Sequence, residues 1–189
     1  MRVLPGVPRG TPSLTFDDGP AEDTEALLDV LARHRVTATF FLVGERVAQH
    51  QGVLERLVRE GHELGNHSWD HPDLRTLPLH AVREQLTRTS DAIEAASGVR
   101  PRLFRPPFGY GSVPIEETAE SLGMRTVLWD VVSYDWMRPG AEAIAMAITS
   151  APAGAVVLLH DGPGDRGQTV AAVELALAAA LDRSATGEH

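Results

Sequence analysis

The sequence predicts one α/β domain built on a parallel sheet, which is either doubly wound or curled into a barrel. Predicted strands and helices alternate along the whole chain, with no internal repeat and no change of composition midway. Ionisable side chains also follow the carboxyl ends of five predicted strands. We place the domain at residues 13–182, between an N-terminal extension at 1–12 and a tail at 183–189 that we expect to be disordered.

In the first half of the chain, short apolar runs alternate with amphipathic segments. Residues 13–17 are predicted as a strand because they lead into an Asp-Asp-Gly-Pro turn, and Leu27, Leu28 and Leu31 indicate a helix over 22–34. The same rules predict a β-branched and aromatic strand at 36–43, a helix at 45–60 closed by Gly61, a weak strand at 62–67 and a long amphipathic helix at 78–97.

The second half repeats this alternation. It contains predicted strands at 102–104, 125–132 and 155–160, and predicted helices at 114–122, 140–150 and 168–182. Neither a G-x-G-x-x-G after a strand nor a G-x-x-x-x-G-K-[ST] is present, so the nucleotide-binding versions of this architecture lose their main support.

Composition excludes several classes of function. The 26 acidic and 17 basic residues give a net charge of −9, which argues against nucleic acid as a partner. Every basic residue is arginine and cysteine is absent, which excludes a lysine nucleophile, thiol catalysis and thiolate metal sites. No apolar run reaches the ~18 residues of a membrane span, and no signal peptide is visible. The compartment stays open: cytoplasmic as written, extracellular if the chain has been trimmed.

The ionisable residues at the predicted strand ends are the main functional signal. The carboxyl ends of parallel strands share one edge, so these side chains should converge on a site there. They are Asp17 and Asp18 after the first strand, His67 and His71 after the third, Arg105 after the fourth, Asp130 and Asp135 at and after the fifth, and His160 at the end of the sixth.

Two of these residues have the spacing of metal ligands. His67 and His71 form a His-x3-His pair, and with Asp18 they make a set of two imidazoles and one carboxylate that leaves positions open for water and substrate. Asp17 leaves the strand in a different direction and could stay free as a base. His160 could be a third imidazole ligand or a general acid or base.

Aromatic residues accompany these candidates. The three tryptophans, Trp69, Trp129 and Trp136, all lie beside them, and such rings suit stacking on sugar faces. Core packing is favoured for Trp129, which still belongs to the predicted strand. Tyr110 lies in another loop that we expect to flank the site.

Five segments in order resemble the motifs of the polysaccharide deacetylase family, the carbohydrate esterases of family 4 with a NodB homology domain. They are TFDDGP at 15–20, HSWDH at 67–71, RPPFG at 105–109, SYDW at 133–136 and LLHD at 158–161. The resemblance covers 13 to about 169 and implies a distorted, incomplete (β/α) barrel with its active site at the carboxyl ends of the strands. The closing strand usual in the family after the last helix is missing here. We therefore expect that edge to be open or covered by another chain.

The resemblance also implies a role for each matching residue. It assigns a divalent metal, most often zinc, to Asp18, His67 and His71. Cobalt and nickel are alternatives because they would accept the same ligands. The implied catalytic residues are Asp17 as base, Arg105 as its orienting partner, His160 as acid and Asp135 as the partner of His160. The implied substrate-binding residues are Phe108 through its backbone N–H, Trp136 and Leu158, to which the aromatic pattern adds Tyr110.

These roles predict removal of N-acetyl groups, with O-acetyl groups as a variant, from an oligosaccharide or polysaccharide containing N-acetylglucosamine. The expected partner is that acetylated substrate, with no nucleic acid and no membrane, and the oligomeric state is left open. Two alternatives remain: a metal-dependent amidase acting on a small substrate, and a catalytically silent sugar-binding module. A glycosidase with two carboxylates would leave the histidine pair unexplained.

Overall fold

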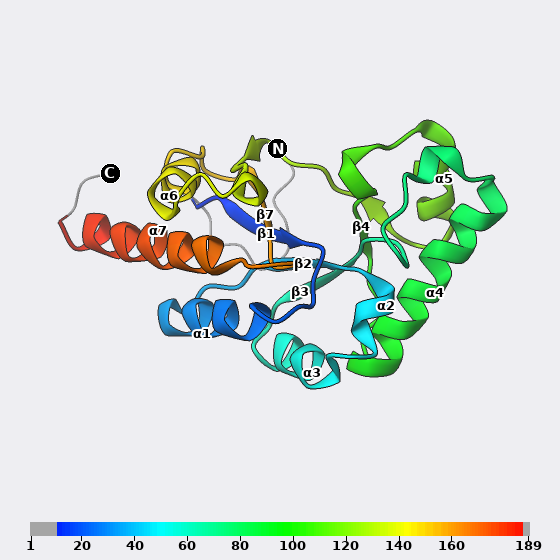
Figure 1. The fold of residues 1–189 in the computed structure, drawn as a ribbon, viewed down its shortest axis with the longest axis horizontal. Coiled ribbons are helices and arrows are strands. Elements are labelled where there is room, and N and C mark those ends of the chain that lie inside the picture. Colours follow the sequence, from blue (N-terminus) through cyan, green and yellow to red (C-terminus); the bar gives the residue numbers. More distant parts are fainter. Residues whose placement is uncertain (1–10, 187–189) are drawn as a thin grey trace.

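The computed structural model of the protein describes residues 11–186 as a curved sheet of seven parallel strands surrounded by helices (Figure 1). The strand order is β5-β4-β3-β2-β1-β7-β6. Because β5 and β6 are the two edges and do not pair with each other, the sheet is an incomplete barrel. The predicted fold class is confirmed. Within the described residues, no strand follows the last helix, and the open side lies between β5 and β6.

The strands are short, and most agree closely with the predicted segments. They are β1 (Ser13–Asp17), β2 (Thr39–Leu42), β3 (Glu63–Asn66), β4 (Leu103–Phe104), β5 (Arg125–Thr126), β6 (Val131–Val132) and β7 (Val156–His160). The helices are α1 (Thr24–His34), α2 (Gly44–Val47), α3 (Gln51–Arg59), α4 (Leu79–Ser97), α5 (Val113–Ser121), α6 (Ala141–Thr149) and α7 (Gly167–Thr186), with 3₁₀ turns η1 (Leu74–Thr76), η2 (Pro107–Gly109) and η3 (Asp135–Met137). None of these helices is long and apolar enough to cross a bilayer.

The single strand predicted at 125–132 is wrong. The chain pairs with β4 as β5, leaves the sheet, crosses the open side of the barrel and joins β7 as β6. Asp130 marks the far side of this crossing: its N–H donates to Val156 O, and its carboxylate accepts from Val156 N. Asp130 therefore anchors a strand and does not line the site cavity described below, contrary to its prediction as a site candidate.

Two helix predictions also need correction. The predicted helix at 45–60 is two helices, α2 and α3, because His50 between them has a non-helical backbone (φ −131°, ψ 41°). Helix α7 ends at Thr186, beyond the predicted end at residue 182. Residues 187–189 of the predicted tail and 1–10 of the predicted extension lie outside the described residues.

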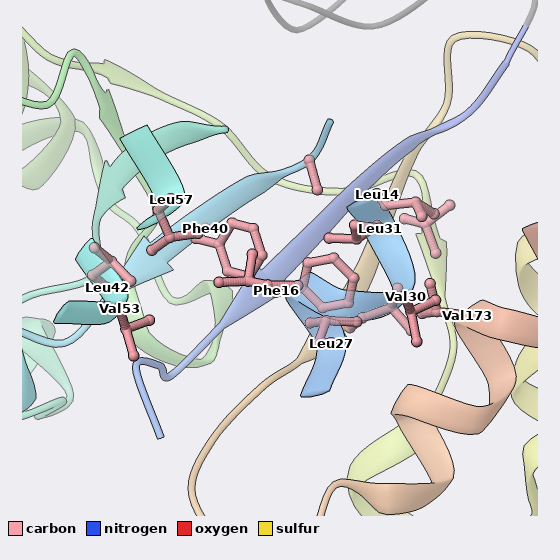
Figure 2. Packing of buried hydrophobic residues seen from close by; sticks show 14 of the residues in the cluster. Leu14, Phe16, Leu27, Val30, Leu31, Phe40, Leu42, Val53, Leu57 and Val173 are labelled. Carbon is pink, nitrogen blue, oxygen red and sulfur yellow. The ribbon is translucent and has the colours of Figure 1, made fainter. Parts of the chain in front are cut away.

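The hydrophobic core lies between the outer face of the sheet and the helices (Figure 2). Phe16 of β1 and Phe40 of β2 stack with their ring centroids 5.1 Å apart, and Leu27 and Leu31 of α1 pack in the same cluster. Side chains alternate across a strand, so the neighbours of these phenylalanines point into the barrel. One of them is Asp17, which is how β1 delivers a carboxylate to the interior.

We expect Phe16→Ala to lower the free energy of unfolding by about 3–5 kcal/mol, because it removes a fully buried ring and leaves a cavity. Urea unfolding would measure this loss. Val113→Ala is the control, since Val113 is 67% exposed and its truncation should cost less than about 0.5 kcal/mol. A Phe16→Ala protein as stable as the control would contradict the packing described.

Candidate functional site

A cavity of about 420 Å³ opens at the carboxyl ends of the strands. Its walls come from β7, from the segments after β1, β3, β4, β6 and β7, and from the segment that crosses the barrel. The lining residues are Asp17, Asp18, His67, His71, Phe108, Gly109, Trp129, Trp136, Leu158, His160 and Arg166. The structure thus brings together residues from all five motif segments, as the parallel topology requires.

The two adjacent carboxylates face different partners. Asp17 is buried at the end of β1, and its Oδ1 accepts a hydrogen bond of 2.6 Å from Arg105 Nη1. Asp18 has a left-handed backbone (φ 72°), which turns its side chain toward the histidines. Its Oδ1 lies 3.3 Å from His67 Nε2 and 3.2 Å from His71 Nε2. One carboxylate is therefore held by a cation and the other completes a cluster of three potential ligands.

The cluster of Asp18, His67 and His71 fits a divalent ion. One ligand atom from each residue lies within 4.8 Å of the others. The Asp18 Oδ1 atom is buried and has no conventional hydrogen-bond partner within residues 11–186. His67 Nδ1 is 2.7 Å from the carbonyl oxygen of Arg105, which leaves Nε2 free to bind an ion. Burial alone would raise the pKa of Asp18, but the two imidazoles lower it well below its usual range.

Arg105 connects the site to the sheet. Its guanidinium is fully buried and donates to Asp17, to Thr15 Oγ1 and to the carbonyl oxygens of Val127 and Leu128. The same group lies over the ring of Phe41, 4.1 Å from its centroid. Side chain and backbone of Arg105 together thus contact both Asp17 and His67.

His160 and Asp135 form a second charged pair in the cavity wall. His160 Nδ1 is 2.8 Å from Asp135 Oδ1, while Asp135 Oδ2 accepts from the backbone N–H of His160 and from Thr169. Burial lowers the pKa of His160, but the hydrogen bond and charge of Asp135 outweigh it and leave that pKa raised. The Nε2 atom of His160 is left for the cavity. Ser133 also bonds the Asp135 carboxylate and holds this loop.

Asp161, the last residue of the fifth motif segment, holds the loop after β1. Its backbone N–H donates to Asp17 O, and its Oδ2 accepts a 2.6 Å hydrogen bond from Thr24. Burial, with the charges of Asp18 and Asp17, raises the pKa of Asp161 to about 7. A Cβ atom on Gly19 would lie 2.1 Å from this carboxylate, so only glycine fits there.

Aromatic rings flank the cavity on two sides. Phe108 and Tyr110 follow β4 and are about half exposed, and the ring of Phe108 meets that of His71 edge-on at 4.6 Å. Trp136 is 43% exposed, and its ring lies 5.1 Å from that of His160. Leu158 of β7 is buried and contributes an apolar surface. The rim is thus aromatic and the ionisable groups lie below it.

Two residues that line the cavity were not predicted as site residues, and the sequence candidates Trp69, Tyr110, Asp130, Arg105 and Asp135 do not line it. Trp129 is partly buried, as core packing predicted, but also forms part of the wall, where Gly109 packs against it. Arg166 was not singled out, although it follows the fifth motif in a turn-rich segment. Trp69 instead packs beneath the guanidinium of Arg88, outside the cavity.

Comparison with known proteins gives a consistent result. The model of a family described as polysaccharide deacetylase matches residues 6–127. The chain is 39% identical to a chitooligosaccharide deacetylase from Sinorhizobium fredii, over 97% of this chain and 92% of that protein. It is also 39% identical to a peptidoglycan-N-acetylglucosamine deacetylase from Listeria monocytogenes, over 84% of this chain and 34% of that protein. A family 4 carbohydrate esterase from Streptomyces lividans, solved with acetate, superposes with a TM-score of 0.86 at 34% identity, covering 92% of this chain and 89% of that one.

We expect Arg105→Met to lower the free energy of unfolding of the chelator-treated protein by about 3–5 kcal/mol, because it removes the buried guanidinium that is paired with the buried Asp17. The double variant Arg105→Met/Asp17→Leu should be more stable than Arg105→Met. Urea unfolding of both variants would test this. As a control, Arg100→Met removes only exposed ion pairs and should cost at most about 1 kcal/mol. A double variant no more stable than the single one would contradict the stated cause.

Proposed function

Since the chain belongs to the polysaccharide deacetylase family, we propose that it is a deacetylase of oligosaccharides or polysaccharides that contain N-acetylglucosamine. The reaction adds water to the acetamido group and yields acetate and the free amine of glucosamine. The observation that carries the proposal is the pairing of Asp17 with Arg105 and of His160 with Asp135 in one cavity beside the three potential ligands. A binding module would need neither a base nor an acid there.

The metal would be held by Asp18, His67 and His71. Members of this family generally depend on a divalent metal. We propose zinc, because two imidazoles and one carboxylate are donors that zinc accepts while keeping a position open. A bound ion would supply Lewis-acid activation of the attacking water and of the amide carbonyl. Cobalt or nickel would accept the same donors.

Asp17 is proposed as the general base. Arg105 donates to Asp17 Oδ1, so Oδ2 is the oxygen available to take a proton from the attacking water. The extensive hydrogen bonding of Arg105 fixes the direction in which that carboxylate points. The roles of the adjacent carboxylates are thus divided: Asp17 moves a proton and Asp18 binds the ion.

His160 is proposed as the general acid. Its Nδ1 is occupied by Asp135, so Nε2 would donate the proton to the leaving nitrogen. Amide cleavage needs this proton because an unprotonated amine is a poor leaving group. The raised pKa of His160 favours the protonated form that this step requires. Asp17 and His160 are register partners on the adjacent strands β1 and β7, so base and acid are neighbours across the cavity floor.

The aromatic rim is proposed to bind the sugar. Tyr110 and Trp136 present exposed rings on which the apolar faces of sugar rings can stack. Leu158 and Trp136 would enclose the methyl group of the acetyl unit. The backbone N–H of Phe108 would donate to the oxyanion that develops on the carbonyl oxygen, a position where a pre-aimed donor is effective.

Acetate release tests the proposed function. We expect the purified protein to release acetate from N-acetylglucosamine oligomers of one to six units, with rates that rise with length as further rings stack, and to stop when a chelator is added. Adding zinc back should restore the activity. Release from a small non-sugar amide alone would favour the amidase alternative, and no release from any acetylated substrate would favour the sugar-binding module.

The division of roles between the two carboxylates gives a second test. Asp17→Asn should reduce kcat by at least about 100-fold with the metal content unchanged, whereas Asp18→Asn, His67→Ala and His71→Ala should lose metal. Metal analysis of the purified variants would measure this. His80→Ala, at an exposed position on α4, is the matched control and should keep its metal. Loss of metal in Asp17→Asn would mean that both carboxylates bind the ion.

The pH profile tests the acid. Activity should fall at alkaline pH as His160 loses its proton. Asp135 raises the pKa of His160 against the opposing effect of burial, so Asp135→Asn should shift the alkaline limb of kcat/KM to lower pH. Asp91→Asn, at an exposed site on α4, should leave the limb in place. If the alkaline limb of kcat/KM stays at the same pH in Asp135→Asn, the loss of activity at high pH belongs to a group other than His160.

A further inference from the structure

The turn that carries both histidines, residues 67–71, has an unfavourable backbone. Ser68 and His71 are non-glycine residues with left-handed conformations, at φ 67° and 59°. Such conformations persist only where the surrounding structure holds them. The turn lies between β3 and η1, so the restraint has to come from neighbouring elements.

The two histidines are restrained differently. The His67 ring is buried and bonded through Nδ1 to Arg105 O. The His71 ring has no such bond: within residues 11–186 its polar contact is Asp18, and its other close neighbours are the rings of His67 and Phe108. The position of the His71 imidazole therefore depends on the backbone just before it, at Trp69 and Asp70.

Two elements hold that backbone. The N–H of Glu45 in α2 donates to the carbonyl oxygen of Trp69 at 2.9 Å, and Gln85 of α4 holds the N–H groups of Trp69 and Asp70. Gln85 Oε1 accepts from Trp69 N at 2.7 Å and, at a longer 3.4 Å, from Asp70 N. Gln85 Nε2 donates to Asp70 Oδ1 at 2.7 Å. One side chain thus serves two backbone N–H groups and one carboxylate of the turn. Gln85 lies outside the five motif segments and does not line the cavity.

We propose that Gln85 is a positioning residue for His71 and thereby sets the affinity of the site for a divalent ion. This inference rests on the metal site of the proposed function. The arrangement needs a side chain that accepts and donates at once. Glutamate could accept both N–H groups but would set a second carboxylate against Asp70, and alanine could do neither.

Zinc titration of the full chain, stripped of metal with a chelator, tests the proposal. Competition with a chromophoric chelator would give Kd. We expect Gln85→Ala to raise Kd for Zn²⁺ about 10-fold, as removal of an outer-shell partner of a metal ligand does. Glu84→Ala is the matched control, because the neighbouring Glu84 is exposed and its side chain makes no hydrogen bond or ion pair within the described residues. Its Kd should equal that of the wild type.

A reversal of donor and acceptor makes the test specific. Gln85→Glu should also raise Kd, because it removes the donor and opposes Asp70. The double variant Gln85→Glu/Asp70→Asn places an amide opposite the new carboxylate and should restore Kd to within about threefold of the wild type, since both hydrogen-bonding capacities are again present. Thermal unfolding of the metal-free variants shows whether each is folded. If Gln85→Ala is not folded, the comparison of Kd between Gln85→Glu and Gln85→Glu/Asp70→Asn tests the proposal.

Two results would overturn the proposal while leaving the metal site in place. One is an unchanged Kd in folded Gln85→Ala or, failing that, in Gln85→Glu. The other is a double variant as weak as Gln85→Glu. A wild-type protein that binds no zinc would overturn it together with the metal site. Because Kd is measured without substrate, absence of acetate release alone would count against the deacetylase function and not against the role of Gln85.

Discussion

The buried ion pair between Arg105 and Asp17 is the interaction on which the site depends. A guanidinium inside the barrel is costly unless every donor is satisfied, and here it bonds Asp17, Thr15 and two carbonyl oxygens of the segment that crosses the open side. The barrel lacks a β5–β6 pairing, and β4 and β1 are not neighbours in the sheet. The Arg105 side chain therefore connects the end of β4, strand β1 and the segment that crosses the open side. The carbonyl oxygen of Arg105 also lies within hydrogen-bond distance of His67 Nδ1.

The residues around the cavity fall into those that face it and those that hold them. Asp17, Asp18, His71 and His160 line the cavity, and each is tied to a supporting group. These supports are Arg105 for Asp17, Asp135 for His160, Asp161 for the loop after β1 and Gln85 for the turn before His71. Left-handed residues, with φ of 72° at Asp18, 59° at His71 and 59° at Phe108, concentrate in these same loops. The geometry needed for chemistry is thus held against local backbone preference.

Much of this arrangement could be predicted from the sequence. Alternating strands and helices indicated a parallel fold, and a parallel fold gathers strand ends at one edge, so Asp18, His67 and His71 were expected together and lie together. The same reasoning placed Arg105 at this edge, and the family resemblance implied its pairing with Asp17, which the structure contains. The choice of barrel over flat sheet came from the five motif segments and not from periodicity, which is the same in both.

What the sequence determined by itself is therefore the set of ionisable residues and the edge of the sheet where they meet, because strand direction and spacing are local properties. Only the tertiary structure decided that 125–132 leaves the sheet and crosses the barrel, that Trp129 reaches the cavity, and that Gln85 holds the histidine turn. Each of these depends on partners distant in sequence, such as β7 for the crossing segment and the turn at 67–71 for Gln85. No local pattern encodes such contacts, since they form only when the sheet curls and α4 packs against it.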